Sequence, residues 1–189
     1  MNVAQKSAST ALSALDTLYN SGTLTLYQGA IPATPETAIG TQTALAQFTF
    51  ANPAFSSPVY TSLQVVGTAS FVSANVTPTA SGTACFARAV ASTYGTELAD
   101  YTVGAAWQPA TAVMAGQFVI NNGNAYYCQT AGTTAASGGP SGTGTNIVDG
   151  TAVWTFYNAG STDIVISTTS LNTGVPISVT SLTHALPAI

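Results

Sequence analysis

Charged side chains are scarce in this chain of 189 residues: 2 are Lys or Arg and 6 are Asp or Glu, which gives a net charge of −4. An ordinary soluble domain has about a quarter of its residues charged. Hydroxyl, amide and backbone groups must therefore keep this surface hydrated. Phosphate recognition needs clustered cations, and Lys6 and Arg88 stand alone, so no binding of nucleic acid is expected.

Long apolar runs are also absent. No run reaches the roughly 18 apolar residues of a membrane span, so no membrane association is expected. Residues 1–20 lack the apolar core of a signal peptide, so an extracellular destination would need another route, such as release inside a virus particle. The hydrophobic fraction of 46% nevertheless excludes a disordered chain. This combination is typical of secreted adhesins and virion components and unusual for a free cytosolic enzyme.

Residues with catalytic chemistry are few. His184 is the sole histidine, and a lone histidine is far more often structural than catalytic. The carboxylates are scattered, no His/Cys cluster has zinc spacing, and the glycine-rich residues 138–144 lack the Gly-Lys-Ser/Thr ending of a phosphate loop. We therefore assign no catalytic residue, no metal ligand and no cofactor, and expect a protein that is not an enzyme. Arg88 is expected to form a local ion pair or a subunit contact.

Two cysteines are present, Cys85 and Cys128. Buried free thiols are the first interpretation, because a buried cysteine behaves as a small hydrophobic residue. The alternative is a disulfide, which would need a close approach of the two Cα atoms.

The spacing of apolar residues predicts a mainly β protein with one N-terminal helix. Residues 4–19 have helical spacing, and Gly22 suits a left-handed cap position. Short alternating segments separated by turn signals favour an antiparallel β-sandwich or barrel. Asn52-Pro53 is expected to end the second strand. The predicted strands are residues 23–27, 44–50, 62–66, 69–76, 82–91, 96–103, 163–167 and 175–183.

A small module interrupts this pattern. Residues 117–129 predict a hairpin around Asn122-Gly123, where both turn residues need positive φ. The Gly/Ser/Thr-rich residues 130–149 are expected to be an exposed loop, and residues 151–157 a third strand. We therefore predict a discontinuous host domain with the N-terminal helix (residues 1–104 plus 160–189) and an inserted three-stranded β module (residues 105–159).

Aromatic residues gather in this module. Aromatic faces stack on sugar rings, and nearby amides such as Asn122 and Gln129 could orient the sugar hydroxyls. The possible glycan-binding residues are Trp107, Tyr126, Tyr127 and Trp154, with Phe156 and Tyr157 beside them. The alternative is that these rings form the core of a small module, with Tyr127 facing away from Tyr126.

The outer segments resemble a family of small bacteriophage proteins encoded near capsid genes. The resemblance lies in GTLTLYQGAIPATPETAIGTQTALAQFTFANPAF, SGTACFARAV, ELADYTVG and STDIVISTTSLNTGVPISVTSLTHALP. In that family the equivalent of Val103-Gly104 runs almost directly into the final strands, whereas about fifty residues intervene here. The resemblance implies a virion β-domain of the head-decoration or minor-capsid type, which carries an insertion.

The module resembles a unit found in phage head and tail proteins, and its opening is similar to chitin-binding-type carbohydrate-binding modules. Trp107 and Tyr126 match the latter pattern, whereas Val113 and Gly116-Gln117 depart from it. The resemblances together imply a protein on the capsid surface, in many copies or as a homo-oligomer, with the major capsid protein or other virion proteins as partners. The alternative is a tail or fibre protein whose module binds host surface glycans.

Overall fold

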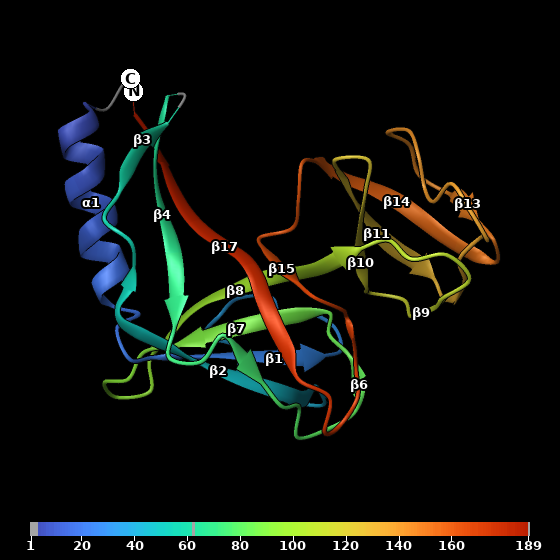
Figure 1. The fold of residues 1–189 in the computed structure, drawn as a ribbon, viewed down its shortest axis with the longest axis horizontal. Helices are drawn as coiled ribbons and strands as arrows, with labels where there is room; N and C mark the ends of the chain where they lie inside the picture. The colour runs from blue at the N-terminus through green and yellow to red at the C-terminus, as the bar shows by residue number, and fades with distance from the viewer. Residues whose placement is uncertain (1–3, 62, 189) are drawn as a thin grey trace.

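The fold is a closed β-barrel of seven strands with additional outer strands and one helix, 49% strand and 7% helical. This computed structural model describes residues 4–61 and 63–188 (Figure 1). The expected mainly β class with one helix is confirmed, and of the two architectures considered it is the barrel that forms.

The barrel wall follows the order β8-β15-β17-β4-β2-β1-β7, and pairing of β7 with β8 closes it. All neighbours in this wall are antiparallel except β15 and β8, which run parallel. The seven strands are β1 (Thr23–Gln28), β2 (Thr43–Phe55), β4 (Gln64–Phe71), β7 (Phe86–Val90), β8 (Glu97–Ala106), β15 (Ile164–Ile166) and β17 (Ile177–Pro187). Short outer strands add to it: β3 (Val59–Thr61) on β4, β5 (Asn75–Val76) on β17, and the pair β6 (Gly82–Thr83) and β16 (Ser170–Leu171).

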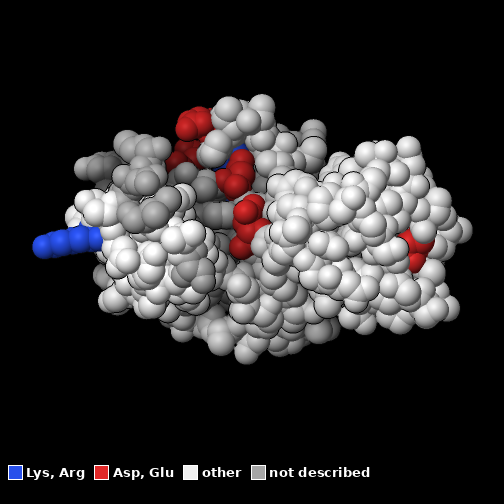
Figure 2. All heavy atoms as spheres, turned by 90° about the horizontal axis from the view of Figure 1, so that it is seen from above, with Lys and Arg blue, Asp and Glu red and all other residues white. Residues whose placement is uncertain are grey.

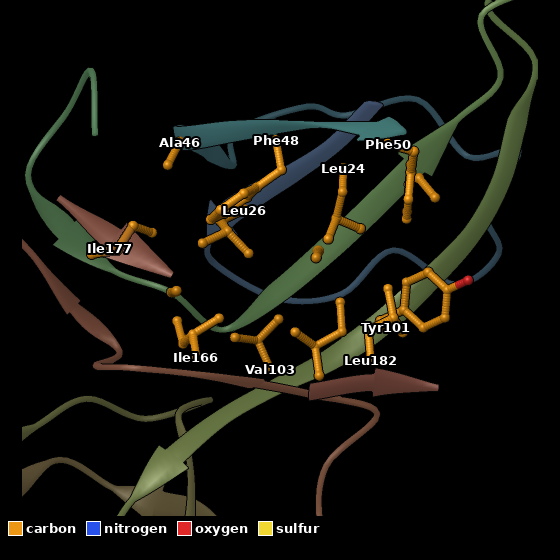
Figure 3. Close-up of a cluster of buried hydrophobic side chains, with 14 of the residues drawn as sticks. Leu24, Leu26, Ala46, Phe48, Phe50, Tyr101, Val103, Ile166, Ile177 and Leu182 are labelled. Carbon is orange, nitrogen blue, oxygen red and sulfur yellow. The ribbon is translucent and has the colours of Figure 1, made fainter. Parts of the chain in front are cut away.

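Alternating apolar side chains fill the barrel. Leu24 and Leu26 on β1 point to the same interior as Phe48 and Phe50 on β2, as the alternation in the sequence predicted (Figure 3). Fully burying one such side chain contributes roughly 2 kcal/mol to stability. The opposite wall supplies Tyr101, Val103, Ile166, Ile177 and Leu182.

Strand β2 does not end at Asn52-Pro53, contrary to the prediction. It continues to Phe55, with an irregularity in its pairing to β4 between Phe50 and Phe55. The side chain of Asn20 accepts a hydrogen bond from the amide of Ala54 (2.8 Å) in this irregular segment. The amide of Ala54 thus bonds to a side chain instead of a neighbouring strand, and β2 continues past Pro53.

Helix α1 (Gln5–Thr17) lies outside the barrel against β4 and β17, with Ala8 and Leu12 packed on Val65 and Ala188. Among the described residues no helix has the length and apolar character needed to cross a membrane. After the helix it is Ser21 that takes a positive φ (57°), not Gly22. Gly22 is needed for another reason, since a Cβ there would lie 2.5 Å from the carbonyl oxygen of Val90.

The module continues the barrel wall along β8. Gly104 pairs with Val165 of β15 on one edge and with Phe118 of β10 on the other. Its sheet holds β10 (Phe118–Asn121), β11 (Asn124–Thr130), β14 (Ala152–Ala159) and β13 (Ile147–Asp149), beside the pair β9 (Ala112–Val113) and β12 (Gly132–Thr133). The three predicted strands are present, and the pattern missed the others because two- and three-residue strands carry no periodic signal.

The chain enters and leaves the module at adjacent points. A Cβ on Gly104 would lie 2.8 Å from Oγ1 of Thr162, and Ile164 pairs with Val103. An insertion between Gly104 and Gly160 requires such neighbouring ends. That residues 105–159 fold as a separate domain remains a prediction.

Candidate functional site

The hairpin β10–β11 is the framework of the module. Asn122 and Gly123 both have positive φ (49° and 74°), as the Asn-Gly signal predicted. Phe118 lies opposite Tyr127 and Val119 opposite Tyr126. Successive residues of a strand face opposite sides, so Tyr126 and Tyr127 are directed to the two faces of the sheet.

Tyr126 and Trp154 form the module core and are 1% and 0% exposed. They pack with Val113, Val119, Cys128 and Ala152, and Tyr126 meets Phe156 edge to face at 6.0 Å. Neither ring presents a face to solvent, so neither is placed to stack on a sugar in this conformation. Tyr126 and Trp154 therefore belong to the hydrophobic core of the module, which was the alternative to a glycan-binding role.

Trp107 closes the same core from the entry side of the module. Its Nε1–H donates to Oδ2 of Asp149 (2.8 Å), and Oδ1 of Asp149 accepts the amide of Ala135 (2.9 Å). The indole N–H is therefore already hydrogen-bonded, to Asp149 at the end of the loop of residues 130–149. Sequence reasoning missed Asp149, because an isolated carboxylate 42 residues away in the chain carries no local signal.

The loop of residues 130–149 is largely exposed, as expected, and hydrogen bonds fasten part of it to the module core. The Asn121 side chain donates to the carbonyls of Gly138 (2.9 Å) and Pro140 (3.1 Å). The Tyr126 hydroxyl donates to the carbonyl of Gly142 (3.2 Å). These hydrogen bonds hold residues 138–142 of the loop, which have no hydrophobic core of their own, against the module core.

Tyr127 lies on the other face of the sheet and is 39% exposed. Its ring meets Phe118 edge to face at 5.3 Å, and Tyr157, 47% exposed, meets the same Phe118 ring at 5.0 Å. The accessible aromatic surface is therefore Tyr127 with Tyr157, supported by Phe118. The four candidate glycan-binding residues are not brought together: three belong to the core side and Tyr127 to the opposite face.

A bridge of buried polar groups joins the module to the barrel. Nε2 of Gln117 donates to Oγ1 of Thr169 (2.7 Å), and both residues are buried. Beside this bond lies a cavity of about 230 Å³, lined by residues of both parts such as Val113, Thr134 and Thr168. This contact limits rotation of the module about its two connections.

Arg88 forms the local ion pair expected of it. Its guanidinium donates from Nε and Nη2 to the two carboxylate oxygens of Asp100, each at 2.7 Å. Nη1 donates to the carbonyl of Thr37 (2.7 Å), so the pair also holds the loop of residues 29–42 on the barrel wall. These bonds to Asp100 raise the pKa of Arg88, although the residue is buried.

A buried polar chain fastens helix α1 to the barrel. Nδ1 of His184 lies 2.7 Å from Oδ1 of Asp16, Nε2 lies 2.8 Å from the hydroxyl of Tyr101, and that hydroxyl donates to Tyr19 (2.9 Å). The imidazole also stacks on Phe55 at 4.1 Å. His184 therefore has a structural environment, as the sequence interpretation held.

Burial raises the pKa of Asp16, and the hydrogen bond from His184 opposes this shift. Burial likewise raises the pKa of Tyr101, which is 8% exposed. The second carboxylate oxygen of Asp16, Oδ2, has no hydrogen-bond partner within the described residues. The chain of bonds joins the helix to the barrel, and Asp16 and Phe55 also line a surface hollow of about 240 Å³.

Comparisons with protein-family models, with curated proteins and with solved structures found no match for this chain. Figure 2 shows that most of the visible face carries neither cationic nor anionic side chains. Within the described residues no group of three or more His, Cys, Asp or Glu side chains could hold a metal ion.

Proposed function

We propose that this chain is a non-enzymatic structural protein of a bacteriophage particle, a capsid decoration or minor head protein. Its barrel binds the major capsid protein or another virion protein, and its module points outward. The observation that carries the proposal is the placement of the module and the helix at opposite ends of the molecule (Figure 1). The resemblance of the outer segments to small phage proteins agrees with it.

The surface for attachment is the barrel end remote from the module. Tyr94, at the tip of the β7–β8 hairpin, is 98% exposed and has a positive φ of 61°. A non-glycine residue in that conformation is strained, and such strain is concentrated at functional sites. Leu18 at the helix end is 53% exposed and borders a hollow of about 430 Å³ together with Ser92 and Leu98 of the hairpin and β8.

The small number of charges supports apolar burial as the force of attachment. With 8 charged residues, of which Arg88 and Asp100 neutralise each other internally, little charge remains to steer a partner. Apolar side chains such as Tyr94 and Leu18 can supply a contact core of the kind that aromatic residues dominate. Many copies on one particle would give avidity to weak individual contacts.

Imaging of the intact particle by electron cryo-microscopy tests the proposal. We expect density for the barrel on the head shell, with the module farther from the shell than the helix. Absence of the chain from the head would contradict the proposal, and density on the tail would favour the alternative below.

Binding to heads that lack the protein tests the attachment surface. Tyr94→Ala combined with Leu18→Ser is expected to weaken binding at least about tenfold, the loss typical of one hot-spot contact. The matched control is Tyr157→Ala, an exposed tyrosine on the module, which should bind like the parent chain. Equal binding by all three proteins would exclude this end as the contact.

The alternative function is a tail- or fibre-associated protein that binds host surface polysaccharide through the module. The exposed pair Tyr127 and Tyr157, held by the Phe118 ring, is the observation in its favour. A glycan array with the full chain and with Tyr127→Ala and Tyr94→Ala variants separates the two functions. A ligand whose binding is lost in Tyr127→Ala but retained in Tyr94→Ala would support the alternative.

A further inference from the structure

The two cysteines lie on opposite sides of the joint between barrel and module. Cys85 directly precedes β7 in the barrel, and Cys128 lies on β11 of the module. They are 3% and 0% exposed, and both are free thiols. Forty-two residues separate them in the chain, so their approach depends on how the module sits on the barrel.

Gly116 brings the two cysteines into one neighbourhood. Its amide donates to the carbonyl of Cys128 (2.9 Å), and a Cβ built on it would lie 4.0 Å from Sγ of Cys85. The backbone of Gly116 is therefore close to both cysteines, whose thiols now donate to the carbonyls of Thr83 (3.5 Å) and Thr130 (3.3 Å).

Thr169 links the neighbours of the two cysteines a second time. Its carbonyl accepts the amide of Ala84, the residue before Cys85 (2.8 Å). Its hydroxyl accepts Nε2 of Gln117, and the carbonyl of Gln117 accepts the amide of Cys128 (2.8 Å). Thr169 thus binds both Ala84, which precedes Cys85 in the chain, and Gln117, which is hydrogen-bonded to Cys128.

We propose that Cys85 and Cys128 form an intramolecular disulfide that locks the module to the barrel when a small-molecule disulfide such as oxidised glutathione is present. One thiolate attacks the oxidant and releases one reduced thiol, which gives a mixed disulfide. The second cysteine, as thiolate, displaces the other half of the oxidant as a second thiol. The two cysteines lose two protons and two electrons in total, and the oxidant is reduced to two thiols.

The environment of the thiols sets the conditions for this reaction. Burial raises the pKa of Cys85, and burial together with the nearby Cys85 raises the pKa of Cys128 to about 11. Since the thiolate is the attacking species, the link forms slowly in the folded protein near neutral pH and faster as the pH rises toward that value. It also forms during refolding, when the thiols are accessible and the fold brings them together.

Trypsin gives a direct test, because Lys6 and Arg88 are the only Lys and Arg residues in the chain. Cleavage after Arg88 separates Cys85 from Cys128. The chain is refolded with a mixture of reduced and oxidised glutathione, its free thiols are then alkylated, and it is denatured and digested. We expect the two large fragments to stay joined on a non-reducing gel and to separate after reduction, with the undigested chain monomeric and lighter by two hydrogen atoms.

The control is the same chain held in concentrated guanidinium chloride with the same glutathione mixture. If the fold brings the thiols together, the ratio of linked to unlinked chain in the refolded protein should exceed that in denaturant by about tenfold or more. Cys85→Ala and Cys128→Ala should each give separate fragments. An equal or lower yield in the refolded parent chain, with both thiols alkylated, would overturn the proposal.

Discussion

The barrel and the module use aromatic residues in different ways. In the barrel, the side chains of Phe48, Phe50 and Phe55 belong to the core enclosed by a closed wall of seven strands. In the module, Tyr126 and Trp154 are covered on one side by a loop that has little regular structure. A closed barrel leaves no open edge in its wall, whereas the module has to be completed by its neighbours. The barrel should therefore tolerate loss of the module better than the module tolerates loss of the barrel.

This comparison can be measured because both tryptophans belong to the module. Trp107 and Trp154 make tryptophan fluorescence a probe of the module, while far-UV circular dichroism reports mainly on the larger barrel. Unfolding in denaturant followed by both probes tells whether the two parts unfold together.

The largest effect is expected for Phe50→Ala in the barrel. The side chain is 0% exposed and stacks on Phe71 at 4.9 Å, so its removal leaves a cavity. The free energy of unfolding should fall by about 3–5 kcal/mol. Both probes should move to lower denaturant together, because the module depends on β8. An unchanged fluorescence midpoint would show that the module is independent of the barrel.

A smaller effect, confined to the module, is expected for Tyr126→Ala. The change empties the module core and removes the hydroxyl that holds Gly142, at a cost of about 3 kcal/mol. The fluorescence transition should shift to lower denaturant while the circular dichroism transition of the barrel stays in place. Tyr127→Ala is the matched control, since that ring is 39% exposed and should shift neither transition appreciably. A joint shift of both transitions would mean that barrel and module form one cooperative unit.

A pH-dependent effect limited to the barrel is expected from Asp16. Its pKa is raised above the ordinary value of 3.8, so the folded chain holds this proton more tightly than the unfolded chain. The stabilisation is fully present below 3.8 and is lost as the pH rises through the raised pKa. His184 contacts Asp16 directly, and Tyr101 and Tyr19 follow it in the same chain of hydrogen bonds.

Urea unfolding between pH 3.8 and neutral pH measures this contribution. Asp16→Asn should flatten the pH dependence of the circular dichroism midpoint, and the fluorescence transition should not respond. An unaltered pH profile in the variant would assign the dependence to another group.

The smallest effect is expected for Gly123→Ala in the hairpin turn. Its φ of 74° is strained for a residue with a Cβ, so the module should lose about 1 kcal/mol of stability. Gly144→Ala is the control, because that glycine has open space around it and a φ outside the positive region. Fluorescence midpoints that are equal in the two variants would show that the turn does not limit module stability.

Local features of the fold could be predicted from the sequence because their causes lie within a few residues. The hairpin at Asn122-Gly123 and the alternation of Leu24 with Leu26 are of this kind. The position of the glycine cap was wrong, because Gly22 is selected by the approach of Val90, a strand distant in the sequence. The glycan-site hypothesis grouped residues by sequence proximity, whereas the two faces of β11 separate Tyr126 from Tyr127.

By itself, the sequence determined the mainly β class, the single helix and the scarcity of charge, and it predicted an insertion after Gly104. These follow from periodicity, turn chemistry and composition. Tertiary structure alone decided which partners meet: Asp16 with His184, 168 residues apart, Trp107 with Asp149, and Gln117 with Thr169. The physical reason is that closure of the barrel fixes which edges and ends become neighbours. Such closure depends on the packing of all strands at once, so no local pattern records it.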